Sequence, residues 1–299
     1  MYTRPTEPRS IGGVLDDGLK LWRESLPKTW PLAVLAQLSV ALPLLLLASK
    51  FPGLVPATPT SPFAPASAAN AQAMLALIKS PTTWLAYVLI LILSVTCYAA
   101  IVLRIANVAA ATADSLGGSL MSALRLLPKL LLQFLLFFVA MIGAGIAFAV
   151  LAGIGSAVTG GRGVITAIMS IAIFFVFAFI FGRVFFASMV LMLEDAGPAE
   201  SIGISWRLTR GYWWRCAGLL LVLIIIGLVF TLVVGFVAAA IGAVLGAGVL
   251  GTGVSQLVSL LANAVLGSLY PAVLIAILYD LKLRKQGGDL LGRVDALAR

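Results

Sequence analysis

Six long apolar stretches constrain this 299-residue chain more than any other feature. They cover residues 30–49, 84–103, 130–153, 164–182, 219–244 and 257–279. A helix needs roughly 20 apolar residues to cross a bilayer core of ~30 Å, whereas barrel strands would alternate over ~10 residues. With 62% hydrophobic and 10% charged residues, the chain has more apolar surface than a water-soluble domain can bury. We therefore predict an all-helical integral membrane protein with six transmembrane helices.

The positions of the cations predict the orientation of these helices. Of the 20 Lys and Arg residues, all but Lys50, Lys79 and Arg162 lie on one side of the six predicted spans. The positive-inside rule then places both termini in the cytoplasm, together with all 11 acidic residues. The formal net charge of +9 is explained by attraction to anionic lipid headgroups. We therefore expect membrane lipids as partners and no nucleic acid.

A short motif occurs three times, as SIGG at 10–13, SLGG at 115–118 and SIGI at 201–204. Each copy opens an amphipathic stretch whose apolar residues recur every three or four positions, and each leading serine can cap a helix. We predict one membrane domain of three parallel pseudo-repeats, each an interfacial amphipathic helix plus a transmembrane hairpin, related by an axis along the membrane normal. The predicted repeats span 9–113, 114–199 and 200–285, followed by a cytoplasmic tail over 286–299.

Two further features concern connections and packing. The Pro- and Ala-rich loop over 50–83 lies on the periplasmic side and is either a plain linker or a flexible lid. Small residues at intervals of four predict that the third and fifth spans pack tightly, through Gly145 and Gly227 among others, because close backbone approach holds helices together in lipid. The alternative is that these glycines only reflect composition.

Catalytic chemistry is poorly supported by the residue types present. The chain has no histidine, which removes the commonest general base and metal ligand. No Asp or Glu falls within the six spans, so a carboxylate proton relay through the bilayer is also unsupported. We expect no enzyme activity, no cofactor and no metal site.

Long polar side chains occur near the cytoplasmic ends of spans two, four and six. Each is followed ten or eleven residues later by an acidic residue; the pairs are Arg104 and Asp114, Arg183 and Glu194, and Tyr270 and Asp280. The residues around Arg104 and Arg183 suggest that helices two and four continue past the arginine. In one reading the arginines snorkel to headgroups or pair with these acidic residues as structural partners.

The second reading is a binding site. Arg104, Arg183 and Tyr270 would converge near the repeat axis, with Asn107 adding an amide donor. Guanidinium groups suit phosphate oxygens because their N–H donors form a planar fork. This arrangement would bind an anion or a phosphate headgroup at the cytoplasmic side.

Three segments resemble a known family. The sequences LEDAGP at 193–198, SWRLTRGYWWR at 205–215 and LYDLKLRKQGGDL at 278–290 are similar to the signature of the glycerophosphoryl diester phosphodiesterase membrane domain and related six-helix bacterial proteins. The resemblance implies a six-helix fold in a bacterial inner membrane. Some family members carry a soluble phosphodiesterase that relies on His and acidic metal ligands, and this chain lacks His. The resemblance therefore implies the membrane fold without the catalytic activity.

Two functions remain open at this point. The first is a non-enzymatic inner-membrane protein that organises lipid or a partner protein at the cytoplasmic face, where the partner is another protein or a second copy of this chain. The second is a permease or channel for a small anionic or phospholipid-derived solute along the repeat axis. Replacing Arg104 and Arg183 by Gln would discriminate between them, because only an anion site depends on both charges.

Overall fold

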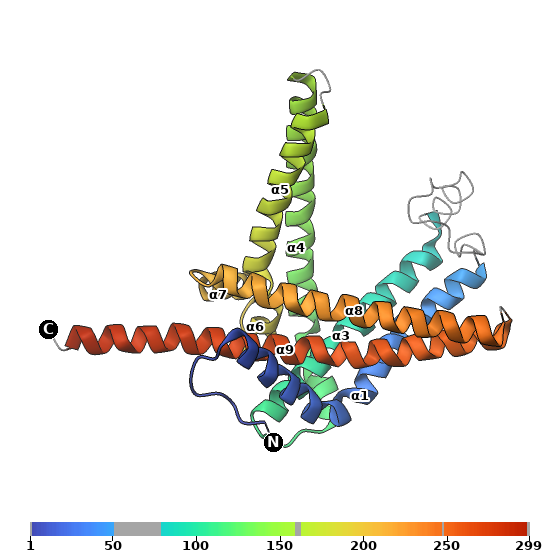
Figure 1. Ribbon diagram of the computed structural model, residues 1–299, viewed down its shortest axis with the longest axis horizontal. Coiled ribbons are helices and arrows are strands. Elements are labelled where there is room, and N and C mark those ends of the chain that lie inside the picture. The colour runs from blue at the N-terminus through green and yellow to red at the C-terminus, as the bar shows by residue number, and fades with distance from the viewer. Residues whose placement is uncertain (1, 51–78, 159–162, 247, 298–299) are drawn as a thin grey trace.

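The computed structural model describes residues 2–50, 79–158, 163–246 and 248–297. All regular secondary structure in these ranges is α-helical. This confirms the all-helical fold class. Figure 1 shows the course of the chain. The helices are α1 (Ile11–Lys50), α3 (Pro81–Ala109), α4 (Leu116–Val158), α5 (Gly163–Val184), α6 (Ala187–Glu194), α7 (Pro198–Thr209), α8 (Trp213–Leu245) and α9 (Val249–Leu297).

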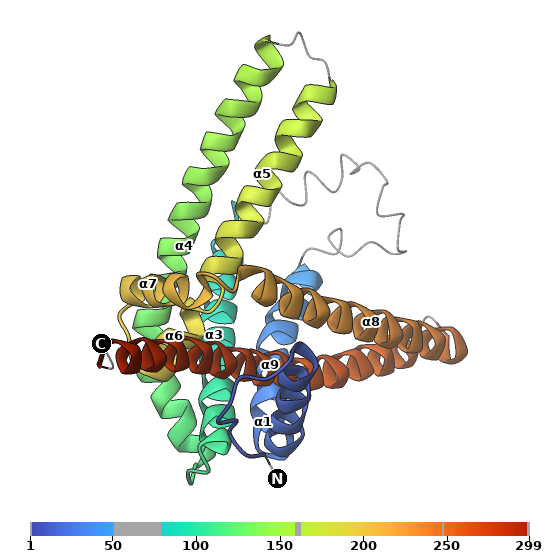
Figure 2. The same cartoon turned by 60° about the vertical axis from the view of Figure 1, so that its left-hand side comes forward.

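The long helices form three pairs that diverge from a common base (Figures 1 and 2). Helix α1 packs beside α3, α4 beside α5, and α8 beside α9. The α4–α5 pair rises away from the base, whereas α8 and α9 run across it, and the short helices α6 and α7 lie at the base itself. Because the three pairs point in different directions, the pseudo-threefold axis stays a prediction.

Four helical segments in the described part of the chain are long and apolar enough to cross a membrane. They are Pro81–Ala109, Leu116–Leu151, Trp213–Leu245 and Leu250–Lys285. Large apolar side chains such as Phe138 and Phe236 lie on their surfaces, at 64% and 78% exposure. Exposed apolar surface of this extent is solvated by lipid, so the chain is a membrane protein.

The other two predicted spans, 30–49 and 164–182, include residues whose side chains lie outside the described part of the chain. Most of the predicted Pro-rich loop, residues 51–78, lies outside it entirely. Six transmembrane helices therefore stay a prediction, and four candidate spans are established by length and composition.

The amphipathic stretches differ from the prediction in how they join the spans. In α1 and α4 the amphipathic stretch and the following apolar stretch form one continuous helix, which includes Pro27 in α1 and Pro128 in α4. Only in the third case is the amphipathic helix, α7, separate from its span, α8. Gly211 between them has φ +89°, a left-handed conformation that glycine adopts without the steric cost of a β-carbon.

The leading serines of the first two motifs cap their helices, as their position predicts. The Gly13 N–H donates to Ser10 Oγ at 3.2 Å, and the Gly118 N–H donates to Ser115 Oγ at 3.0 Å. A β-carbon at Gly118 would lie only 2.9 Å from Ser115 Oγ. The glycine three residues after the serine therefore leaves room for the capping hydroxyl.

The third serine, Ser201, does not cap a helix. Helix α7 begins three residues earlier at Pro198, whose fixed φ suits the first helical position, and the preceding Gly197 N–H donates to Glu200 Oε2 at 3.3 Å. Ser201 lies inside the helix, where its hydroxyl accepts a hydrogen bond from Gln133 Nε2 of α4 at 2.9 Å. The shared motif thus has a different role in this copy.

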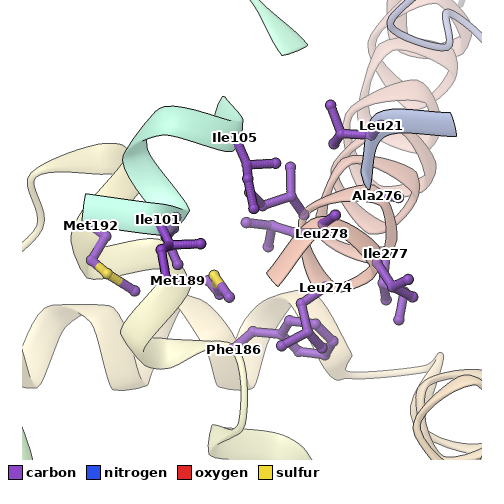
Figure 3. Packing of buried hydrophobic residues seen from close by; sticks show 14 of the residues in the cluster. Leu21, Ile101, Ile105, Phe186, Met189, Met192, Leu274, Ala276, Ile277 and Leu278 are labelled. Carbon is purple, nitrogen blue, oxygen red and sulfur yellow. The ribbon is translucent and has the colours of Figure 1, made fainter. Parts of the chain in front are cut away.

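The core lies at the base, where the three helix pairs meet. Figure 3 shows buried side chains of this core, among them Leu21 of α1, Ile105 of α3 and Leu278 of α9, together with Phe186 and Met189 at the start of α6. All five side chains are buried. Close van der Waals packing of these side chains holds the diverging pairs together at the base.

The small residues of the third and fifth spans have different surroundings. Helix α8 packs along α9, whereas α4 packs on α3 and α5. Gly227 of α8 faces Tyr270 of α9, and a β-carbon at Gly227 would overlap the tyrosine hydroxyl. Gly145 of α4 has open space beside it. Gly227 thus lies at a close helix contact, whereas Gly145 does not.

Candidate functional site

Arg104 lies near the end of α3, which continues past it to Ala109 as the sequence suggested. Its Nε atom is 3.8 Å from Asp114 Oδ2, and the two side chains are only 11% and 10% exposed. Asp114 also accepts a hydrogen bond from Ser119 Oγ at 2.6 Å, so the carboxylate is held in place. The structure therefore pairs Arg104 with the acidic residue ten positions later.

Arg183 has a different environment. Helix α5 ends one residue after it, at Val184, and does not continue into α6. Glu194, which the spacing offered as a partner, instead forms an ion pair with Lys282 at 2.6 Å. Within the described ranges Arg183 makes no ion pair with a carboxylate. The second predicted pairing is thus absent.

Aromatic rings surround Arg183 in place of a carboxylate. Its Cζ atom lies 4.8 Å from the ring centroid of Phe179 and 5.0 Å from that of Trp206, close enough for cation–π attraction. The Trp213 ring lies 5.4 Å from that of Phe179. We call these four residues, Phe179, Arg183, Trp206 and Trp213, the Arg183 cluster. They come from α5, α7 and α8.

Two backbone contacts position the cluster. Ser205 Oγ of α7 donates to the carbonyl oxygen of Arg183 at 2.8 Å, which ties α7 to the end of α5. A β-carbon at Gly182 would lie 3.1 Å from Trp213 Nε1. Glycine at this position therefore lets the indole of α8 approach the backbone of α5.

Two N–H donors of the cluster have no hydrogen-bond acceptor. Both Arg183 Nε and Trp213 Nε1 are buried and unpaired. A buried donor without an acceptor costs about 1–3 kcal/mol, and more when it is charged. A guanidinium group and an indole N–H together suit an anionic oxygen ligand, because both can only donate. The cluster is therefore the candidate anion site of this structure.

Asp280 is only 2% exposed, and its carboxylate is held by groups from three parts of the chain. Its Oδ2 atom lies 3.0 Å from Arg215 Nη2 and 3.0 Å from Arg284 Nε. Its Oδ1 atom accepts the Arg9 N–H at 2.9 Å, and the Arg9 carbonyl accepts from Nη2 of both arginines at 2.6 Å. This network joins the N-terminal segment to α8 and α9.

The remaining candidates, Tyr270 and Asn107, have separate surroundings. Tyr270 packs on Gly227 of α8. Asn107 lies near the end of α3, where its carbonyl oxygen accepts hydrogen bonds from Thr112 N at 3.0 Å and Thr112 Oγ1 at 3.2 Å. Convergence of Arg104, Arg183, Tyr270 and Asn107 on one axis stays a prediction.

Two cavities at the base of the described structure are lined by charged residues, and none of these four candidates lines either of them. One, of about 620 Å³, lies at the N-terminal segment. The other, of about 320 Å³, includes the ion pair of Glu194 and Lys282 in its wall, with Lys285 beside it. Both cavities are bordered by charged side chains from the base of the molecule.

Sequence reasoning singled out Arg183 but missed the other members of its cluster. Phe179 was read as part of an apolar span, although a spacing of four residues places it on the same helix face as Arg183. Trp206 and Trp213 were assigned to an amphipathic face. Their approach to Arg183 depends on how α7 and α8 cross α5, and no local spacing signals it.

Comparison with known proteins does not identify the chain. No family model, no curated protein and no solved structure matches it. The resemblance to the glycerophosphoryl diester phosphodiesterase membrane domain therefore stays a prediction from the three segments quoted above. What the chain does must be argued from its helices and from the Arg183 cluster.

Proposed function

We propose that this chain is a non-enzymatic multi-pass protein of a bacterial inner membrane, and that it organises anionic lipid at the cytoplasmic face. In this proposal six helices in three repeats cross the bilayer, with both termini in the cytoplasm. Four candidate spans support the membrane assignment. The distribution of Lys and Arg along the chain supports the orientation.

One observation carries the lipid-binding part of the proposal. Arg183 is half-buried among aromatic rings and forms no ion pair within the described ranges. Its Nε–H is buried without an acceptor, as is the Trp213 indole N–H. A phosphate oxygen of a lipid headgroup can accept from such donors. Binding would satisfy both groups at once.

The depth of the cluster agrees with a headgroup ligand. Arg183 lies in the last turn of α5, at the end of a predicted span. Trp206 of α7 and Trp214 of α8 are both exposed, and tryptophan is enriched where the hydrocarbon meets the headgroups. A lipid phosphate lies at this level of a bilayer.

Two capping serines support the repeat part of the proposal. Ser10 and Ser115 each accept the N–H of the residue three positions later, at the starts of α1 and α4. The two helices thus begin with the same local geometry and continue into an apolar stretch. A duplicated unit accounts for both the motif and its geometry.

The test of lipid binding is Arg183→Gln in the full-length protein. The purified, delipidated protein is titrated with phosphatidylglycerol, and bound lipid is counted by native mass spectrometry. Losing a charged hydrogen-bond donor removes about 1.5–3 kcal/mol, so we expect the affinity to fall about tenfold or more. Equal binding by the wild type and the variant would refute the proposed site.

Arg125→Gln is the matched control, because Arg125 is an exposed cation of α4 outside the cluster. It should keep the affinity within about twofold, since surface charges contribute little. Uptake of glycerol phosphate into proteoliposomes separates the permease alternative. If Arg183→Gln abolishes uptake while lipid binding is unchanged, the protein is a permease and not a lipid organiser.

Topology is tested separately with reporter fusions. A reporter inserted in the 51–78 loop and one at the C-terminus should lie in opposite compartments, because an odd number of proposed spans separates them. Finding both in the same compartment would disprove the six-span arrangement with cytoplasmic termini.

A further inference from the structure

The N-terminal segment, residues 2–9, is attached to α9 at two points. The Cζ atom of Arg4 lies 4.3 Å from the ring centroid of Tyr279, and the Arg9 N–H donates to Asp280 Oδ1 at 2.9 Å. The cavity of about 620 Å³ is lined by residues of this segment and of the first turns of α1. The contacts with Tyr279 and Asp280 therefore hold residues 2–9, which form one side of the cavity, against α9.

Every residue that lines the cavity has a polar or charged group in its side chain. The wall contains two hydroxyl, three cationic and two carboxylate side chains, and no aliphatic one. Ligand pockets of similar volume are usually lined mostly by apolar side chains. A wall with this many hydrogen-bonding and charged groups suits a small hydrophilic molecule.

Two buried atoms of the wall have opposite hydrogen-bonding needs. The Tyr2 hydroxyl and Asp17 Oδ2 are both buried without a hydrogen-bond partner. Asp17 Oδ2 lies 3.8 Å from Arg9 Nε, too far for a hydrogen bond. Burial, followed by the negative charge of Asp17, raises the pKa of Tyr2 to about 12, so its hydroxyl keeps the proton and can donate. The cavity thus offers one donor and one anionic acceptor.

A cation in the wall is also available to a ligand. Lys20 is already paired with Asp16 at 2.6 Å. Arg23, three residues further along α1, is exposed and makes no ion pair in the described part of the chain. Its guanidinium is therefore free to bind an anionic group.

We propose that this cavity binds a small zwitterionic phosphate ester of the phosphoethanolamine class. The phosphate lies toward Arg23 and the Tyr2 hydroxyl, and the ammonium lies toward Asp17. A simple anion would leave Asp17 Oδ2 without a hydrogen-bond donor, although Arg9 lies at ion-pair distance, and would be repelled by the carboxylate. A ligand with both charges satisfies the donor and the acceptor. This site is separate from the Arg183 cluster and takes a different ligand.

The full-length protein in detergent is titrated calorimetrically with O-phosphoethanolamine and with inorganic phosphate. The wild type should bind the ester at least about tenfold more tightly than phosphate. Asp17→Asn should remove this preference by weakening ester binding alone, and Arg23→Gln should weaken both ligands. No ester binding, or an unchanged preference in Asp17→Asn, would overturn the proposal.

Two controls keep these results interpretable. Tyr2→Phe removes one hydroxyl group and should weaken ester binding several-fold without altering the melting temperature, while Arg183→Gln should leave ester binding unchanged. Failure of this site and failure of the lipid proposal are therefore distinguishable. Phosphatidylethanolamine in nanodiscs tests whether the ligand is a lipid or a soluble molecule. If the lipid competes with O-phosphoethanolamine for the cavity, the ligand is a lipid headgroup. If it does not compete, the ligand is a soluble ester.

Discussion

Tyr270 of α9 lies so close to Gly227 of α8 that a β-carbon at residue 227 would overlap the tyrosine hydroxyl. Gly227 is buried in the α8–α9 interface. This contact sets how closely the two helices approach, and close approach at small residues is the main source of helix association in lipid. Both helices are candidate spans, so the contact tests the packing inside the membrane.

Gly227→Ala should lower the melting temperature in detergent, because the added methyl group forces Tyr270 or the helices apart at a cost of about 1–3 kcal/mol. Adding Tyr270→Leu should recover most of the loss by shortening the opposing side chain. Gly145→Ala on α4 is the control, with open space at the β-carbon, and should be neutral or slightly stabilising. A stable Gly227→Ala variant would contradict the packing.

Asp280→Asn should be strongly destabilising. The buried carboxylate lies 3.0 Å from both Arg215 Nη2 and Arg284 Nε, and breaking such a pair costs about 3–5 kcal/mol. The Arg9 backbone loses a charged acceptor, so limited proteolysis should cut the N-terminal segment faster. Asp16→Asn, which breaks the exposed pair with Lys20, should leave the melting temperature almost unchanged, because solvent screens that pair.

Ser201→Ala should destabilise the protein by leaving Gln133 Nε2 without its acceptor. Gln133 is buried and its Oε1 atom already lacks a partner, so we expect a loss of about 1–3 kcal/mol. The double variant Ser201→Ala with Gln133→Leu should be more stable than Ser201→Ala alone, because no buried polar pair remains. Thermal unfolding followed by circular dichroism measures both, and a double variant less stable than the single one would contradict this role.

Tyr2 should ionise only at strongly alkaline pH. Burial raises its pKa from 10.0 to about 12. Because the folded-state pKa is the higher one, the contribution of Tyr2 to stability is complete below pH 10 and is lost as pH rises towards 12. Comparing the tyrosinate absorbance of the wild type with that of Tyr2→Phe should show one titration missing near pH 12. A missing titration near pH 10 would show that Tyr2 is not buried.

Much of the local structure could be predicted from neighbouring residues. The apolar stretches predicted helices, and the serines at 10 and 115 predicted caps that the structure contains. The pairing of Arg104 with Asp114 also spans only ten residues and follows the end of α3. These features depend on backbone geometry within a few turns of the chain, which the local sequence determines.

Prediction from the repeated motif failed where a second local signal, such as a proline that starts a helix, acted at the same place. Ser201 shares the motif of Ser10 and Ser115, but Pro198 starts the helix earlier and turns the serine towards Gln133. Gly211 separates α7 from α8, whereas no such break divides α1 or α4. A repeated motif therefore predicted similar helices without predicting where each one begins.

The sequence by itself determined that this chain is helical, that it belongs in a membrane and which side chains are charged at its base. Only the tertiary structure decided that Arg183 lies among Phe179, Trp206 and Trp213, and that Asp280 meets Arg9 across 271 positions of the chain. The physical reason is that helix formation depends on residues within one or two turns, whereas the faces that meet depend on how whole helices cross.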